Sequence, residues 1–282
     1  EKFDKYWSPG EDNAHISLEK FFKSSLSNYK EVRDIPSVSG TSKLSPHLRF
    51  GEITTNQIIN HFKFHDNHAL SKHEEHFIKE LYWREFSYYI LFHFPYVIDK
   101  PFNKKYENFE WEVNYKDNLE NWKKGNTGIR IVDAAMNELL ETGWMHNRVR
   151  MVVGSFLVKH LRINWTEGEK HFRNCLLDFN KANNVAQWQW VAGCGADAAP
   201  YFRIFNPILQ GEKFDKEGLY VKKWVPELEK VPSKFVHKPW EMEIKYQQAI
   251  KTIIGKDYPQ PIVIHEKARA SALEAFQSLK KN

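Results

Sequence analysis

Apolar residues recur at helical spacing along most of the chain, and several of these segments begin with a recognisable capping sequence. In a capping box, a hydroxyl side chain and an acid or amide three positions later satisfy each other's backbone N–H groups. Thr54 to Gln57, Ser71 to Glu74 and Thr166 to Glu169 fit this pattern. Ile53 and Ile58 add a hydrophobic staple around the first of these boxes. The pattern predicts helices over residues 18–35, 54–62, 71–93, 127–142, 146–161, 166–178, 183–191, 216–224, 239–251 and 265–279.

Proline, glycine and small polar residues mark the segments between these helices. Ser17 is expected to cap the first helix, and Thr127 the fourth. The expected non-helical segments are an irregular lead-in over 1–16, loops over 95–126 and 197–215, and an extended stretch over 258–264. No alternating strand pattern and no Gly/Ser or charged linker interrupts the chain. The sequence therefore predicts an all-α fold with residues 1–282 forming a single domain.

The helix expected over residues 71–93 has two unlike faces. At 100° per residue, its apolar and aromatic residues cover one broad side, namely Phe77, Ile78, Leu81, Tyr82, Tyr88, Tyr89 and Phe92. The residues that fall together on the other side are Glu80, Trp83, Arg84 and Ser87. Two interpretations stay open for that second side. It is either a solvated face on which Glu80 pairs with Arg84, or a site for a flat ligand, which Trp83 between a carboxylate and an arginine would suit.

The segment from Gly143 to Trp190 mixes large rings, amides, arginines and one carboxylate inside what otherwise resembles core helix. Gly143 itself is expected to end the preceding helix as its C′ residue. In the next helix, the apolar stripe is opposed by a second set of residues that should also be buried, namely Asn147, Met151, Gly154 and Val158. A mid-helix glycine costs about 1 kcal/mol in helix propensity. Gly154 therefore indicates the close approach of a ligand or of another backbone, and close helix packing is the simpler alternative.

Residues 40–46 combine small and hydroxyl side chains with one lysine, just ahead of a helical segment. Hydroxyl and backbone N–H groups near a helix N-terminus beside Lys43 could hold a phosphate. A plain N-cap loop is the alternative, because such caps are common.

Composition excludes several functional classes. Of the 282 residues, 41% are hydrophobic and 15% aromatic, which is typical of a globular protein, and the net charge of +5 permits an anionic partner without requiring one. Only Cys175 and Cys194 are present, and no segment resembles a signal peptide or membrane span, so a reducing, cytoplasmic location without a membrane partner is expected. No metal-ligand spacing, Gly-x-Ser-x-Gly elbow, Rossmann loop or Walker loop occurs. Aromatic, amide and arginine chemistry remains, which suits planar ligands and nucleic acid.

Five motifs occur in order along nearly the whole chain: Gly-Thr-Ser-Lys-Leu-Ser-Pro at 40–46, Trp-Arg-Glu-Phe at 83–86, Gly-Trp-Met-His-Asn-Arg-Val-Arg-Met at 143–151, Trp-Gln-Trp at 188–190 and Asp-Ala-Ala-Pro-Tyr-Phe-Arg at 197–203. Together they resemble the FAD-binding helical domain of the DNA photolyase and cryptochrome family. The resemblance is closest to the class I cyclobutane pyrimidine dimer photolyases. The family's N-terminal α/β domain, which holds the antenna pigment, has no counterpart in this sequence, so the identity of that pigment stays open.

The resemblance implies FAD as the cofactor. It places Asp178 and Arg150 as a pair beside the isoalloxazine, where a positive charge favours the anionic reduced flavin, and Asn184 opposite flavin N5. The family's cofactor-binding positions correspond here to Tyr29, Thr41, Ser42, Lys43, Leu44, Ser45, Phe77, Arg150, Asp178, Phe179, Asn180 and Asn184. Two positions depart from the family pattern: Asn180 stands where an aspartate is usual, and Phe77 where a tryptophan is common.

The resemblance also implies damaged DNA as the partner, bound by a monomer. Trp83 and Trp190 would flank a pyrimidine dimer turned out of the duplex, with Glu80 and Asn147 bonding base edges and Met151 packing below. The DNA-binding positions are Arg33, Glu80, Trp83, Arg84, Asn147, Arg148, Met151, Trp190, Arg203 and Gln210. Of these, Arg33, Arg148, Arg203 and Gln210 correspond to positions that contact the DNA backbone in the family. The positions with a catalytic role are Glu80, Asn184 and a tryptophan relay that reduces the flavin in light, formed by Trp111, Trp165 and Trp188.

These roles predict a light-driven lyase in which excited reduced FAD donates an electron to a cyclobutane pyrimidine dimer, the ring splits and the electron returns. Asn147 and Met151 favour this substrate over the (6-4) photoproduct, whose enzymes typically carry histidines in this region. A cryptochrome-like photoreceptor is the first alternative. A flavin-free helical module that binds nucleic acid is the second.

Overall fold

A computed structural model describes residues 3–62, 69–201 and 203–281; Phe202, in the loop expected over 197–215, lies outside them. The all-α class is confirmed, and the one β-type contact in the described residues is an isolated bridge between Ile254 and Tyr258. The helices are α1 Glu11–Ser24, α2 Tyr29–Val32, α3 Ser45–Phe50, α4 Thr55–Asn60, α5 Lys72–His93, α6 Lys116–Lys123, α7 Arg130–Thr142, α8 Asn147–Ser155, α9 Trp165–Cys175, α10 Lys181–Ala192, α11 Pro207–Phe214, α12 Leu219–Trp224, α13 Ile244–Ala249 and α14 His265–Lys281. None of the helices so described is long and apolar enough to cross a membrane.

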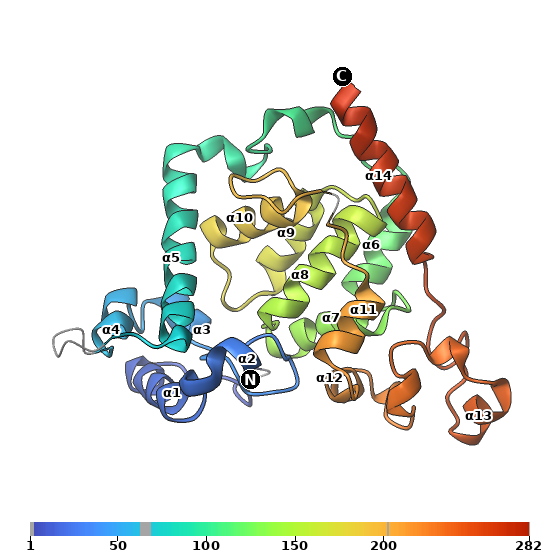
Figure 1. The fold of residues 1–282 in the computed structure, drawn as a ribbon, viewed down its shortest axis with the longest axis horizontal. Coiled ribbons are helices and arrows are strands. Elements are labelled where there is room, and N and C mark those ends of the chain that lie inside the picture. The colour runs from blue at the N-terminus through green and yellow to red at the C-terminus, as the bar shows by residue number, and fades with distance from the viewer. Residues whose placement is uncertain (1–2, 63–68, 202, 282) are drawn as a thin grey trace.

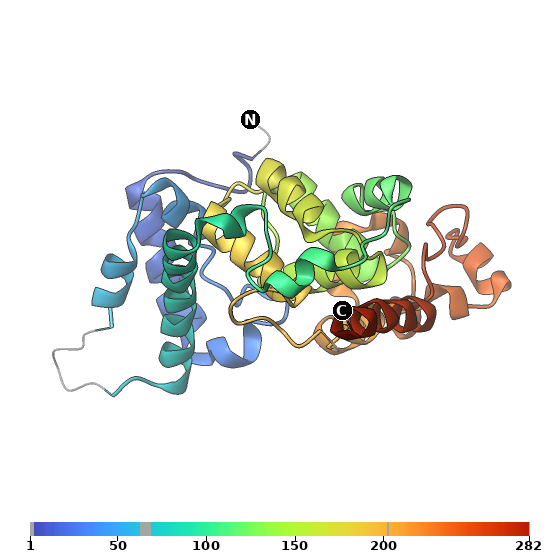
Figure 2. The ribbon, with the colours of Figure 1, turned by 90° about the horizontal axis from the view of Figure 1, so that it is seen from above.

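Helices α7 to α10 form the centre of the molecule, with α5 along one side and α14 along the other (Figures 1 and 2). Helix α10 packs against α5, α8 and α9, while α7 packs against α8, α11 and α12. Two hydrophobic clusters result. The larger is built mainly on the central helices, and the smaller joins α1, α4 and the first half of α5 through Leu18, Ile58 and Phe77.

The strongest local signals are confirmed. Thr54 and Ser71 each form a complete capping box, with Gln57 and Glu74 respectively. Helix α5 ends at His93, as expected from Pro95. Gly143 follows α7 with a φ of 69°, the left-handed conformation that favours glycine at this position.

The N-terminal prediction is wrong in its boundaries. Helix α1 begins at Glu11, so the lead-in is shorter than 1–16 and Ser17 is not an N-cap. The segment expected to be one helix over 18–35 is divided at Ser25 into α1, a 3-10 turn over Leu26–Asn28 and α2. The acidic residues Glu11 and Asp12 favour the earlier start because they interact with the positive end of the helix dipole.

Two further caps differ from the prediction. Asn164, not Thr166, caps α9, and its Oδ1 accepts a hydrogen bond from Thr166 N at 3.1 Å. Glu169 is not part of a capping box, because its carboxylate pairs with Arg173. Thr127 lies three residues before α7 and donates its backbone N–H and hydroxyl to Asp133 Oδ1, at 2.8 and 2.6 Å.

Other boundaries need correction as well. Helices α6 and α11 lie in segments expected to be loops; α6 forms because it buries Leu119 and Trp122, and Asn206 caps α11. Helix α4 ends at Asn60 and α9 at Cys175, both earlier than predicted. Helices α12 and α13 are shorter than 216–224 and 239–251. The end of the 146–161 helix is a π-helical turn over Phe156–His160.

The broad aromatic side of α5 does not face the core along its whole length. Phe77, Ile78 and Leu81 are buried in the smaller cluster, whereas Ile90 belongs to the larger one. Between them the inward face of the helix changes, and Ser87 is buried. The side chains left exposed are Tyr82, Tyr88, Tyr89 and Phe92.

Candidate FAD- and DNA-binding cavity

A cavity of about 330 Å³ lies where the two hydrophobic clusters meet, with residues of both in its wall. The predicted site residues that it brings together are Tyr29, Arg33, Thr41, Ser42, Lys43, Leu44, Ser45, Phe77, Glu80, Trp83, Arg84, Asn147, Arg150, Met151, Asp178, Asn180, Asn184, Trp188 and Trp190. Those that do not line it are Trp111, Arg148, Trp165, Phe179, Arg203 and Gln210. Gly154 also lines the cavity, and a Cβ there would lie 3.1 Å from Val191, so close packing of α8 on α10 accounts for the glycine.

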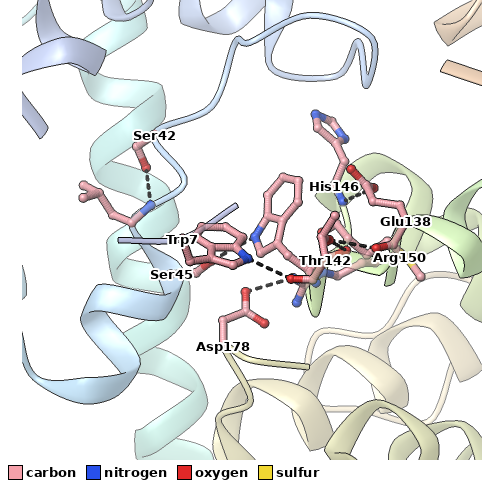
Figure 3. A network of polar contacts seen from close by, with 11 residues as sticks. Trp7, Ser42, Ser45, Glu138, Thr142, His146, Arg150 and Asp178 are labelled. Atoms are coloured by element: carbon pink, nitrogen blue, oxygen red, sulfur yellow. Dashed lines mark hydrogen bonds and ion pairs between the residues drawn. The ribbon is translucent and has the colours of Figure 1, made fainter. Parts of the chain in front are cut away.

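The loop over residues 41–45 forms one wall of the cavity (Figure 3). Helix α3 begins at Ser45 without a side-chain cap, so the plain N-cap alternative is not what the structure shows. Ser45 Oγ instead accepts a hydrogen bond from Trp144 Nε1 at 3.1 Å. Lys43 has a φ of 52°, and burial lowers its pKa. This wall therefore offers hydroxyl groups, uncapped backbone N–H groups and a cation, the groups that bind phosphate.

Arg150 and Asp178 form an ion pair in another part of the cavity lining, where Arg150 lies 6.0 Å from the Trp144 ring centroid (Figure 3). Arg150 Nη2 lies 2.8 Å from Asp178 Oδ2, and Arg150 Nε donates to the carbonyl of Met145 at 2.7 Å. The Asp178 side chain is only 3% exposed, and its Oδ1 is buried without a hydrogen-bond partner among the described residues. An acceptor left unpaired in a cavity wall fits a ligand that donates a hydrogen bond there.

Two asparagines sit at the α10 side of the cavity. Asn184 donates its Nδ2 to the backbone carbonyl and to Oε1 of Glu169, both at 3.1 Å. Asn180 is the N-cap of α10, and its Oδ1 accepts from Asn183 N at 3.1 Å. Asparagine caps a helix about as well as aspartate, so the departure at position 180 keeps the local structure.

Charged residues at the rim of the cavity pair differently from the expected i, i+4 pattern. Glu80 does not pair with Arg84; its Oε1 lies 2.5 Å from Arg33 Nη1. Arg84 instead pairs with Glu85, at 2.8 Å. Trp83, beside them, is 45% exposed although it lines the cavity, so its ring is accessible to a large ligand.

A buried carboxylate on α7, that of Glu138, anchors the start of α8. Glu138 Oε2 accepts from His146 N at 3.1 Å and from the Tyr220 hydroxyl at 2.7 Å. His146 is the N-cap of α8 and its Nδ1 accepts from Arg148 N at 3.2 Å. This anchoring sets the direction of the helix that carries Asn147, Arg150 and Met151.

His146 should make the protein less stable in acid. Burial lowers the pKa of His146 to about 4, whereas an unfolded histidine has its ordinary value near 6.5. Between these values only the unfolded state binds the proton, so stability falls as the pH drops, by up to about 1.4 kcal/mol per pH unit. Urea unfolding at about pH 7 and pH 5 should show a smaller fall for His146→Asn, which keeps an N-cap side chain. Equal falls would mean that His146 does not carry the effect.

The three tryptophans expected to form a relay differ in their surroundings. Trp188 lines the cavity and packs at 5.0 Å from Phe172 and 6.1 Å from Trp122, between ring centroids. Trp165 is buried, and Trp111 is half-buried against Phe109 at 4.5 Å. Of the three, only Trp188 thus lies where an electron could pass directly to a ligand in the cavity.

The sequence analysis did not predict several residues of the cavity lining. Trp144, Asn183 and Gln187 line the cavity without an expected role. Trp144 stands within the motif at 143–151, and its ring lies 5.3 Å from Lys43 Nζ. Asn183 comes three residues after Asn180, and Gln187 comes four residues after Asn183. This spacing places all three on one helical face and could have indicated a shared wall.

Known proteins match both the sequence and the fold. The profile of a family described as the FAD binding domain of DNA photolyase matches residues 77–278. A deoxyribodipyrimidine photo-lyase of Agrobacterium fabrum is 49% identical over 279 residues, which make up 99% of this chain and 58% of that relative. A solved class III photolyase from Agrobacterium tumefaciens has a TM-score of 0.94 at 49% identity and covers 100% of this chain and 58% of its own. A solved cryptochrome from Synechocystis sp. PCC6803 has a TM-score of 0.88 at 31% identity, covering 96% and 56% respectively.

The chain thus spans a little over half the length of these relatives. One of them is a class III enzyme, so the class I subdivision stays a prediction. The profile covers well over half of the chain, and the cavity lies largely on helices inside it. The chain therefore belongs to the DNA photolyase and cryptochrome family, through that family's FAD-binding domain.

Proposed function

We propose that the protein repairs cyclobutane pyrimidine dimers in DNA by light-dependent lyase chemistry, using FAD held in the cavity. One observation carries the proposal: a single cavity joins the residues expected to hold the cofactor with those expected to hold the dimer. Arg150 and Asp178 lie in the same cavity wall as Trp83, Asn147 and Met151. Electron transfer between a cofactor and a base needs this kind of proximity.

The residues present fit FAD. The hydroxyl groups of Thr41, Ser42 and Ser45 and the cation of Lys43 would hold the phosphates, while Arg150 would stabilise negative charge on the flavin ring. The unpaired Oδ1 of Asp178 would accept a hydrogen bond from the cofactor. Reduced FAD would supply the electron that splits the dimer on illumination.

Another part of the cavity lining suits a pyrimidine dimer turned out of the duplex. Trp83 and Trp190 present rings on which bases can stack, and Glu80 and Asn147 offer polar groups to base edges. Turning a nucleotide out of the duplex costs less at a damaged site, which favours dimers over intact DNA. Contacts from the nearby arginines to phosphates would make binding weaker at higher salt.

A cryptochrome-like photoreceptor is the second candidate, favoured by the 31% identity and TM-score of 0.88 to the Synechocystis cryptochrome. Such a protein would keep the cofactor side of the cavity but would not need the dimer side. The presence of Glu80, Trp83, Asn147, Met151 and Trp190 in the lining of the same cavity supports repair instead. We also propose that residues 1–282 act as one domain and as a monomer, in a reducing compartment that suits the free thiols of Cys175 and Cys194.

Repair should require light. The purified protein with reduced FAD would be mixed with an oligonucleotide that carries one cyclobutane thymine dimer, and the dimers would be counted after blue-light and dark incubation. We expect loss of the dimer only in light, and no change in an oligonucleotide that carries a (6-4) photoproduct. Equal dimer levels in light and dark would contradict repair and favour the photoreceptor.

A further inference from the structure

Four charged residues alternate in sign in one row, which we call the rim: Glu80 and Arg33 line the cavity, whereas Asp34 and Arg148 continue the row outside its wall. Arg33 Nη1 lies 2.5 Å from Glu80 Oε1, and Arg148 Nη2 lies 2.5 Å from Asp34 Oδ2. Asp34 Oδ1 is also 3.9 Å from Arg33 Nε. One carboxylate, that of Asp34, therefore lies between two arginines that come from different parts of the chain, the turn after α2 and the first turn of α8.

Both arginines are held on their other sides by aromatic rings. The guanidinium carbon of Arg33 lies 5.2 Å from the Tyr29 ring centroid, and that of Arg148 lies 4.4 Å from the Phe214 ring centroid. Their side chains are 11% and 18% exposed, against 31% for Asp34. Arg148 Nε is buried and has no hydrogen-bond partner among the described residues. Two largely buried cations need compensating charges: Glu80 supplies one to Arg33, and Asp34 supplies the one to Arg148 while it also lies 3.9 Å from Arg33.

We propose that Asp34 is a positioning residue that determines how well the protein distinguishes dimer-containing DNA from intact DNA, an inference that rests on the proposed function. Arg33 and Arg148 are expected to contact the DNA backbone. A guanidinium fixed between a ring and a carboxylate presents its remaining N–H groups in one direction only. It can therefore bind phosphates in one arrangement, that of a backbone distorted around an extruded dimer, better than those of a regular duplex.

The negative charge of Asp34 also favours dimer-containing DNA over intact DNA. With both carboxylates present, the four residues sum to zero net charge, so the rim attracts undamaged DNA only weakly. Without Asp34 the rim gains one positive charge, and Arg148 loses its ion pair and becomes free to follow any phosphate. Binding to intact duplex should then strengthen and become more sensitive to salt, because sequence-independent binding follows the number of phosphates neutralised.

The test compares Asp34→Asn with the wild type. Affinities for a dimer-containing duplex and for the same undamaged duplex would be measured in the dark at several salt concentrations. We expect the ratio of the two affinities to fall about tenfold, as the loss of a charged hydrogen bond implies. The salt slope for undamaged DNA should steepen by about one counterion. Parallel changes that leave the ratio within about twofold of the wild type would overturn the inference.

A second variant separates position from charge. Asp34→Glu keeps the negative charge but moves the carboxylate by one methylene group, so it should keep the wild-type salt slope and still lower the ratio. If Asp34→Asn does not fold, this variant alone decides, and an unchanged ratio would overturn the inference. Asp117→Asn, on the exposed surface of α6, matches the charge change and should keep the wild-type ratio. A wild type without preference for dimers would contradict the proposed function instead, because it would leave nothing for Asp34 to modulate.

Discussion

Asp178→Asn should lower the affinity for FAD by roughly 10- to 100-fold, the equivalent of one charge-assisted hydrogen bond. Asp178 carries the carboxylate that pairs with Arg150 at 2.8 Å, and its second oxygen is an unpaired buried acceptor in the cavity wall. The amide keeps the shape of the side chain but removes the negative charge and replaces one acceptor with a donor. The free energy of unfolding of the cofactor-free protein should change less than the free energy of FAD binding. The reason is that Arg150 is partly exposed, so water can compensate for its lost partner.

Fluorescence titration of the cofactor-free protein with FAD would measure this change, with thermal unfolding as the check on the fold. Asp197→Asn makes the same chemical change on an exposed loop and should bind FAD like the wild type. A wild-type affinity in Asp178→Asn would mean that the Arg150–Asp178 pair only joins α8 to the segment before α10. A large loss of affinity in both variants would instead indicate a nonspecific effect of charge.

The fold follows from local sequence wherever a short-range signal has no competitor. Thr54 and Ser71 cap helices as predicted, since the partners of their capping boxes lie three residues away in the sequence and form both expected hydrogen bonds. The same pattern fails at Thr166, because Glu169 pairs with Arg173 and accepts from Asn184. A partner fifteen residues away cannot be seen in a four-residue motif.

Where hydrophobic periodicity predicts an element or its buried face wrongly, tertiary packing explains the difference. Helix α6 carries two buried residues, Leu119 and Trp122, in an otherwise polar segment. His171, Phe172 and Trp188, which are distant in sequence, pack around Trp122 and contribute to its burial. Helix α5 passes from one hydrophobic cluster to the other, so its inward face changes along its length and a single amphipathic stripe cannot describe it.

The sequence predicted some kinds of site residue better than others. Side chains expected to touch a ligand, such as Thr41, Arg150 and Trp83, belong to motifs and do line one cavity. Residues that act through others have no such signal. Asp34 lies next to Arg33 in sequence, but its contact with Arg148 spans 114 positions and appears only in the folded chain.

Trp188→Phe should lose nearly all light-driven reduction of bound FAD, while repair by protein reduced chemically beforehand should stay close to wild type. Trp188 is the one residue of the expected relay that lines the cavity, and a benzene ring is much harder to oxidise than an indole. The relay would therefore be interrupted at its first step, whereas the residues around the dimer would be unchanged. The measurement is the loss of oxidised flavin absorbance during blue-light illumination with an external reductant.

Trp188→Phe should also lower the stability of the protein, because the Trp188 ring is closely packed. A Cβ at Gly168 would lie 2.1 Å from that ring, and Phe172 and Trp122 cover its other sides, so the smaller phenyl ring leaves a void. The cost should stay below the about 3–5 kcal/mol typical of truncating a large aromatic residue to alanine. Trp224→Phe, on a half-buried tryptophan of α12 outside the cavity wall, should keep photoreduction. Full photoreduction in Trp188→Phe would exclude Trp188 as the required electron donor. It would direct attention to the other tryptophans of the cavity lining, and first to Trp144, whose ring lies 5.3 Å from Lys43 Nζ.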